Sequence, residues 1–249
     1  LEQSDKALFA PVIDDNKIKA LPRANTIYDY TPVLWINKTW RENLGFDKPE
    51  TIEEVFDLAM AFATEDPDGN GVQDTYGLAL NKSLSGINYF MNAYEVYAPA
   101  PDASYMMWLK DSDGNYVNGV TDPKSKEVLG RLNELYEAGA IDPEFAIKDA
   151  NKSDELIAAG KVGIYTGYFY SRIPAANQRK NYPGTEWETI SFAAAEGVSE
   201  YKPGVPLNTA GYYYVRKGYE HPEALVVMMN HISDGYGAPW LVEGDPTEF

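Results

Sequence analysis

The fold class follows from a pattern that first appears at residues 33–63 and then repeats along the chain. Val33-Leu-Trp-Ile36 is a short apolar run of the kind that forms a buried strand. Thr51 and Glu54, three residues apart, form a capping-box signal for the start of a helix. Between residues 52 and 63 apolar side chains recur at helical spacing, so one face of this helix is apolar.

The same alternation continues to the end of the chain. We expect further helices at 37–45, 85–97, 122–139, 153–159 and 221–232, further strands at 76–80, 161–166, 189–195 and 212–215, and a hairpin formed by 105–109 and 116–120. In the helix over 122–139 the expected buried stripe is Val128, Leu129, Leu132, Leu135 and Tyr136. Alternating strands and helices predict an α/β class, and the hairpin makes mixed strand pairing possible.

Composition excludes several functional classes. The 249 residues carry 21 Lys and Arg against 38 Asp and Glu, a net charge of −17, which argues against nucleic acid and against anionic membrane surfaces. Cysteine is absent, so disulfides and thiolate chemistry are excluded, and the two histidines make a His-rich metal site implausible. No apolar run approaches the roughly 18 residues of a membrane span. The chain starts at Leu1 without a signal peptide, and we expect it to be cut from a longer protein at both ends.

The sharpest local motif is the loop Asp66-x-Asp68-x-Asn70-Gly71-x-x-Asp74. Oxygen-bearing side chains at positions 1, 3 and 5, with Gly at 6, match the first half of an EF-hand calcium loop. Asp66, Asp68, Asn70 and Asp74 would ligate through side chains and Val72 through its carbonyl. Gly77 stands where the bidentate Glu is expected, and a metal-free polar turn remains the alternative. Asp111-Ser-Asp-Gly-Asn115 looks similar but is expected to be a hairpin turn.

Catalytic motifs are scarce. The dinucleotide fingerprint, the phosphate-binding loop and the nucleophile elbow are all missing. His221 and His231 are expected to be ordinary surface or capping residues. Carboxylates are plentiful, so counting them leaves a two-carboxylate hydrolase open.

Aromatic residues are more informative. The 19 Tyr and 5 Trp cluster at Tyr28-Asp-Tyr30, Tyr89-Phe90, Tyr105-Met-Met-Trp108, Tyr165-Thr-Gly-Tyr-Phe-Tyr170 and Tyr212-Tyr-Tyr214. A flat apolar ring with a polar end suits stacking on sugars while bonding hydroxyl groups. Core packing is the ordinary alternative for any single ring, but we expect several of these rings to line a cleft.

An ordered series of segments resembles the family 1 extracellular solute-binding proteins, the sugar-capturing components of ABC importers. The segments are Lys17-Ile-Lys-Ala-Leu-Pro22, Pro32–Trp40, Leu44-Gly-Phe46, Lys48–Glu54, Asp66–Leu78, Leu135–Asp142, Ala158–Tyr165 and His221–Leu225. The loop places the chain near the oligosaccharide-binding lipoproteins and the similar alginate-oligosaccharide binders, which carry a calcium ion in such a loop.

The resemblance implies a periplasmic-binding-protein-like lobe with three layers, in which helices cover both faces of a mixed sheet. Residues 1–31 would be an interlobe crossing, 32–207 the second lobe, and 208–249 the return crossing and the start of the other lobe. The implied function is capture of an extracellular oligosaccharide for an ABC importer permease, without chemistry and with structural calcium. The parent protein would be tethered to the outer face of the cell membrane by a lipid anchor in a missing N-terminal part.

The resemblance also nominates ligand-binding residues. They are Arg23, Tyr28 and Tyr30 in the crossing, Gly167, Tyr168 and Tyr170 after a strand, and Asn208, Gly211 and Tyr212 in the return segment. Arg23 could instead form a salt bridge with a nearby carboxylate. Two other functions stay open: a carbohydrate-active hydrolase, and an interaction module that binds no small molecule and exposes an apolar patch.

Overall fold

The computed structural model describes residues 8–24, 31–96, 108–110, 113–168, 170–202 and 209–234. Contacts within the chain divide it into two units, one made of Leu1–Ile27 with Pro206–Phe249 and the other of Tyr28–Val205. In the described ranges no helix is long and apolar enough to cross a membrane.

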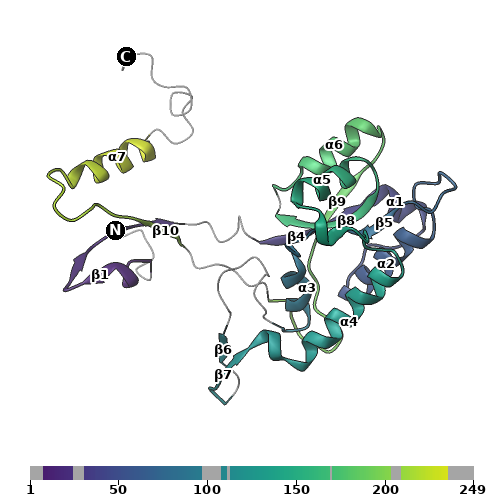
Figure 1. Ribbon diagram of the computed structural model, residues 1–249, viewed down its shortest axis with the longest axis horizontal. Coiled ribbons are helices and arrows are strands. Elements are labelled where there is room, and N and C mark those ends of the chain that lie inside the picture. The colour runs from purple at the N-terminus through teal and green to yellow at the C-terminus, as the bar shows by residue number, and fades with distance from the viewer. Residues whose placement is uncertain are drawn as a thin grey trace. The chain divides into compact units, whose positions relative to one another are not determined.

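A four-stranded mixed sheet lies at the centre of the larger unit (Figure 1). Its order is β5 (Tyr76–Leu78), β8 (Val162–Tyr168), β4 (Pro32–Asn37) and β9 (Trp187–Ser191). β5 runs parallel to β8, whereas β4 is antiparallel to both β8 and β9. The register pairs Trp35 with Tyr165 and Val33 with Gly167, so the tail of β8 lies beside the start of β4.

The main core covers one face of this sheet. Leu34, Ile36 and Ile164 point into it, together with Phe56 and Phe62 of the helix α2 (Ile52–Thr64). The other helices that contribute to this core are α1 (Lys38–Asn43), α3 (Ile87–Ala93) and α4 (Pro123–Glu137). Burial of these apolar side chains supplies the main stabilisation of the unit, at roughly 25 cal/mol per Å² removed from water.

A smaller core covers the opposite face, under α5 (Ala150–Ala158) and α6 (Ile173–Asn181). Trp35 alternates with Leu34 along β4 and therefore points to this second side. Its indole stacks on the Tyr165 ring with centroids 5.6 Å apart and planes 3° apart. Figure 1 shows α5 and α6 on one side of the sheet and α1 and α2 on the other. The predicted three-layer arrangement with a mixed sheet is therefore present.

Local sequence signals explain several helix starts. The Thr51 side chain accepts from the Glu54 N–H and the Glu54 side chain accepts in return, so the predicted capping box is formed. Asn37 caps α1, because its side chain accepts from the Trp40 N–H. Asp122 caps α4, with proline at the first helical position.

Other expectations need correction. α6 was not predicted, because it has a weak apolar periodicity and no side-chain cap at its start. In α4 Val128, Leu132 and Leu135 are buried, but Leu129 and Tyr136 are exposed, so the expected stripe was too wide. β5 and α3 are shorter than expected. Within the described residues the expected hairpin is present as β6 (Trp108–Lys110) and β7 (Tyr116–Asn118), and residues 105–107 lie outside the described ranges. Short 3-10 turns lie at Gly119–Thr121 and Phe145–Ile147.

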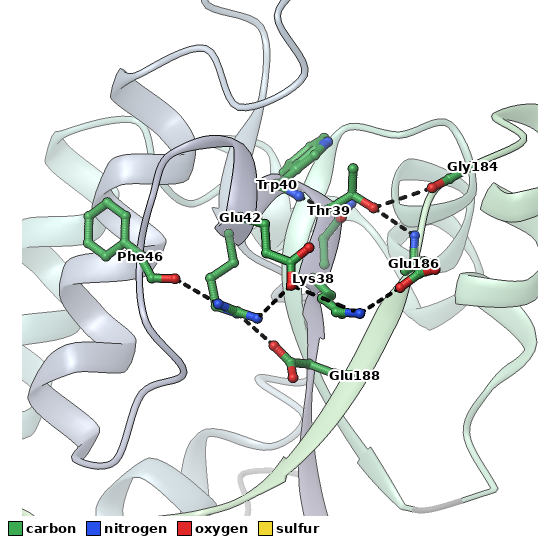
Figure 2. Close-up of polar contacts among 10 residues, drawn as sticks. Lys38, Thr39, Trp40, Glu42, Phe46, Gly184, Glu186 and Glu188 are labelled. Carbon is green, nitrogen blue, oxygen red and sulfur yellow. Dashed lines mark hydrogen bonds and ion pairs between the residues drawn. The ribbon is translucent and has the colours of Figure 1, made fainter.

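A polar network joins α1 to β9, as Figure 2 shows. The guanidinium of Arg41, whose side chain is 10% exposed, donates to the Glu188 carboxylate at 2.7 Å and to the Phe46 carbonyl at 2.7 Å. Lys38 pairs with Glu186 at 2.7 Å on the exposed edge of the same network. These contacts hold α1 against the last strand of the sheet.

The smaller unit contains two antiparallel pairs and a helix. A hairpin joins β1 (Ile13–Asp14) to β2 (Lys17–Ile18), preceded by a 3-10 turn at Ala10–Val12. β3 (Leu21–Ala24) pairs with β10 (Thr209–Tyr213), which brings the two ends of the chain's described part into one ribbon. The helix α7 (Glu223–Asp234) follows.

Candidate functional site

The end of β8 and the tight turn after it carry three of the predicted ligand-binding residues. The Ser171 N–H donates to the Tyr168 carbonyl at 2.9 Å, and the Tyr168 N–H donates to the Ser171 hydroxyl at 3.0 Å. A Cβ at Gly167 would lie 2.7 Å from the Ser171 Cβ, so only glycine fits this position without a shift. The turn is therefore closed by its own residues before any ligand arrives.

Two aromatic side chains support this turn from the sheet. The Trp35 indole N–H donates to the Tyr168 carbonyl at 3.2 Å, and the Tyr165 hydroxyl donates to the Ser171 carbonyl at 2.9 Å. Burial raises the pKa of Tyr165 far above its usual value, so its hydroxyl keeps the proton that it donates. The stack of half-buried Trp35 on buried Tyr165 thus fixes the backbone of the turn.

The turn presents two tyrosine rings side by side. The centroids of Tyr168 and Tyr170 lie 5.3 Å apart, with planes inclined by 31°. The Tyr168 hydroxyl lies 3.3 Å from the Tyr89 hydroxyl of α3, which ties this ring to the main-core side of the sheet. Tyr170 is 48% exposed and offers its surface to solvent. Paired rings of this kind can stack on the apolar face of a ligand while their hydroxyls bond polar groups.

A pocket of about 330 Å³ lies beside Tyr170, on the side of the sheet covered by α5 and α6. Its walls include Tyr165, Tyr170 and the apolar residues Ile173 and Pro174, with Asp154 of α5 as the charged group. Partial burial raises the pKa of the Asp154 carboxyl. The pocket size is at the lower end of the range of small-molecule sites.

The predicted site residues therefore fall into three groups. Gly167 and Tyr168 end β8, and Tyr170 lies beside Tyr168 in the turn that follows. Arg23, Gly211 and Tyr212 lie together in the β3–β10 ribbon, where Arg23 is opposite Gly211. Tyr28, Tyr30 and Asn208 lie outside the described residues.

Sequence reasoning missed two polar residues of this region. Ser171 could have been found, because a Ser three residues after a strand end is a common turn-forming position. Asp154 could not, because it lies on a short helix among other charged residues and has no motif around it.

The loop over residues 66–74 is wrapped around its own acidic side chains. The Asp66 carboxylate accepts from the N–H groups of Asn70 at 3.1 Å and Gly71 at 2.9 Å. The Asn70 side-chain amide donates to Asp68 at 2.9 Å and to Asp74 at 3.3 Å, while its oxygen accepts from the Val72 N–H at 2.7 Å. The four predicted side-chain ligands thus converge.

Charge in this loop is balanced by a lysine. Lys161, directly before β8, forms an ion pair with Asp74 and lowers the pKa of that carboxyl. Partial burial and the neighbouring carboxylates of Asp66 and Asp74 raise the pKa of Asp68. Among the described residues no group of three or more His, Cys, Asp or Glu side chains is arranged as a metal site. The donor types still fit a hard cation, since rotating the Asn70 amide and displacing Lys161 would leave oxygens facing one point.

Several known proteins are similar to this chain in sequence or in fold. No family model matches the chain. It is 30% identical over 144 residues to lipoprotein LipO of Bacillus subtilis (strain 168), which covers 57% of this chain and 28% of LipO. It is 28% identical over 180 residues to the polygalacturonan/rhamnogalacturonan-binding protein YtcQ of the same organism, covering 72% of this chain and 34% of YtcQ. A third relative is the fructooligosaccharide ABC transporter substrate-binding protein FusA of Streptococcus pneumoniae serotype 4, 26% identical over 61% of this chain and 28% of FusA. The chain is thus similar in sequence to one lipoprotein and to two proteins that are named for saccharide binding.

Solved structures of substrate-binding proteins share the fold. An HMO-binding ABC-transporter-associated solute-binding protein from Bifidobacterium longum infantis superposes with a TM-score of 0.70 at 20% identity, over 92% of this chain and 48% of that one. An EF-hand mutant of S. pneumoniae FusA in complex with fructo-nystose superposes with a TM-score of 0.62 at 20% identity, over 93% of this chain and 46% of that one. The predicted fold class is confirmed. The chain spans about a third of the length of LipO, YtcQ and FusA, the three curated relatives that it matches.

Proposed function

We propose that this chain forms part of an extracellular solute-binding protein that captures an oligosaccharide and presents it to the permease of an ABC importer. The observation that carries the proposal is the Tyr168–Tyr170 pair on a turn that is closed before ligand arrives. Rings held in place lose little freedom on binding, so more of the stacking energy contributes to affinity. Relatives whose names state saccharide binding support the choice of ligand.

The proposed activity is capture without bond making. The named relatives are binding proteins. A ligand held by ring faces and hydroxyl contacts leaves unchanged when the site opens, and its affinity for the closed state drives closure. Turnover of a bound oligosaccharide would instead identify the hydrolase alternative.

We assign residues 1–31 to the crossing between two lobes, residues 32–207 to the second lobe, and residues 208–249 to the return crossing and the start of the other lobe. The pairing of β3 with β10 supports this assignment, because an outgoing and a returning strand form such a ribbon. Arg23, Gly211 and Tyr212 on the ribbon, together with Tyr28, Tyr30 and Asn208, would supply further ligand contacts. Arg23 suits bidentate bonding to sugar oxygens.

We assign a structural calcium ion to the loop over residues 66–74. Asp66, Asp68, Asn70 and Asp74 would hold it through side-chain oxygens, and Val72 through its carbonyl. Calcium would neutralise clustered carboxylates and fix the connection between α2 and β5. The EF-hand named for a FusA structure supports this assignment.

We place the parent protein outside the cell, held at the outer face of the membrane by a lipid anchor beyond this sequence. The lipoprotein name of LipO supports this location.

The function is tested by measuring the shift in melting temperature of the calcium-loaded chain against neutral and acidic oligosaccharides, followed by calorimetric titration of the sugars that raise it. Ligand binding to the native state should raise the melting temperature with dose. Tyr168→Ala should weaken binding by roughly tenfold, the effect of about 1.4 kcal/mol, with little loss of stability.

The matched control is Tyr116→Ala on β7, which removes an exposed tyrosine away from the turn. This variant should bind like the unaltered chain. A flat response to every sugar, or equal losses in both variants, would refute the proposed capture site.

A further inference from the structure

The pocket beside Tyr170 contains a carboxylate that nothing in the described part of the chain neutralises. Asp154 forms no ion pair or hydrogen bond with any described residue, whereas the nearby Lys152 is paired with Glu155 at 2.6 Å. Asp154 and Tyr165 line the same pocket. Asp154 is exposed on the wall of this pocket, so both of its oxygens can accept hydrogen bonds from a ligand that enters.

The rest of the pocket is complementary to a compact, partly apolar molecule. Ile173 and Pro174 at the start of α6 offer an aliphatic wall, and Tyr170 offers a ring beside it. The volume of about 330 Å³ suits one ring-sized unit of a larger ligand. The pocket borders the same turn that carries Tyr168, so a chain stacked on the two tyrosines can place its next unit there.

We propose that this pocket is a subsite for one neutral sugar unit, and that Asp154 selects it over a uronic acid unit. The inference rests on the proposed capture of an oligosaccharide and adds a specificity to it. An ionised carboxylate only accepts hydrogen bonds, and two neighbouring sugar hydroxyls can donate to its two oxygens. A uronate would bring a second negative charge next to Asp154, and like charges in direct contact disfavour binding.

The net charge of −17 also disfavours acidic ligands, but it cannot by itself select a neutral sugar over a uronic acid at one subsite. Charges spread over an exposed surface are screened within about 8–10 Å at physiological salt. A single carboxylate in contact with the ligand is screened much less. Asp154 therefore decides between ligands of the neutral kind named for FusA and the acidic kind named for YtcQ at this subsite.

The test uses disaccharide pairs that differ only at C6, where one member carries CH2OH and the other a carboxylate, in both gluco and galacto configurations. Binding to the isotope-labelled chain is followed by NMR at the backbone amides of Thr166 and Ser171, which border the pocket. We expect the unaltered chain to prefer the neutral member by about tenfold or more. Asp154→Asn, which keeps the shape and removes the charge, should reduce that preference to about twofold.

Glu155→Gln on the same helix is the matched control and should leave the preference unchanged, because that side chain is 64% exposed and paired with Lys152. A preference for the uronate, or an unchanged preference in Asp154→Asn, would overturn the selection by Asp154 and leave sugar capture standing. If none of the four disaccharides shifts these amides up to its solubility limit, both the subsite and the proposed function fail.

Discussion

Gly77 on β5 lies so close to Ala59 on α2 that a Cβ at position 77 would be 1.9 Å from the Ala59 carbonyl oxygen. The neighbouring atoms belong to helix backbone, so they cannot move aside cheaply. Gly77 is also the position at which an EF-hand loop would carry its bidentate Glu. Packing between helix and sheet therefore excludes that ligand, and a calcium ion here must complete its shell in another way.

Replacing Gly77 by Ala should destabilise the fold by at least ~1–3 kcal/mol, the usual cost of forcing atoms into a packed interior. Gly130→Ala is the matched control, because position 130 is exposed within α4 and has no neighbour within 4 Å of an added Cβ. It should stabilise the protein by about 0.5–1 kcal/mol through helix propensity. Urea unfolding followed by tryptophan fluorescence measures both, and equal effects would contradict the close packing.

The buried guanidinium of Arg41 should matter more than the exposed ammonium of Lys38. Arg41→Met leaves the Glu188 carboxylate, 19% exposed, and the Phe46 carbonyl without their donor. The expected loss is about 3 kcal/mol, typical for breaking a largely buried pair. Lys38→Met removes a pair exposed to solvent and should leave the urea midpoint unchanged within error. If both variants unfold alike, the network in Figure 2 is only a surface feature.

Calcium should raise the melting temperature of the chain, and a chelator should reverse the effect. Asp68→Asn should weaken calcium binding by about tenfold or more, because the number of charged ligands sets affinity in such loops. Lys161→Met should tighten binding, since the ammonium that pairs with Asp74 competes with the ion. Calorimetric titration with calcium measures these affinities.

The control for the calcium variants is Asp113→Asn, in the turn between β6 and β7 whose sequence superficially resembles the loop. Its calcium affinity should equal that of the unaltered chain. Identical melting curves with and without calcium would show that the loop is a metal-free polar turn.

Asp154→Asn should stabilise the chain at neutral pH. The folded-state pKa of Asp154 is raised above the ordinary 3.8, so the native state holds this proton more tightly than the unfolded state. Stability therefore falls as pH rises from 3.8 through the folded pKa, and the penalty is fully present above that window. The variant should gain melting temperature above this window and lose the gain below pH 3.8.

Melting curves from acid to neutral pH check this prediction, with Glu155→Gln as the neighbouring control. A variant no more stable than the unaltered chain at pH 7 would show that the Asp154 carboxyl is fully solvated. A gain in stability when a charge is removed is expected for a group that serves ligand binding rather than folding.

Sequence signals were reliable where the physics is local. The capping box at Thr51 and Glu54 involves atoms within one helical turn, and the structure forms it as expected. The apolar run at Val33–Ile36 lies in the central strand β4 as expected, with Leu34 and Ile36 buried on one face and Val33 and Trp35 half-buried on the other. By contrast, Leu129 and Tyr136 have residue types that suit a core, but neighbouring elements do not cover them.

The candidate site was predictable only in part. Gly167, Tyr168 and Tyr170 were nominated through a family resemblance, and they do lie together at the end of β8 and in the turn after it. Whether they contact a sugar stays a prediction. Asp154 had no signal, because its role depends on α5 packing beside β8, and that pairing joins residues more than ten positions apart.

By itself, the sequence determined the class of fold, the main strands and helices, the excluded chemistries and the acidic loop, because these depend on periodicity, capping and composition. Tertiary structure alone decided the order of the sheet, the exclusion of a Glu at Gly77 and the support of the Tyr168 carbonyl by Trp35. Each of these is a contact between segments distant in sequence, and its geometry is set by how helices pack on the two faces of the sheet.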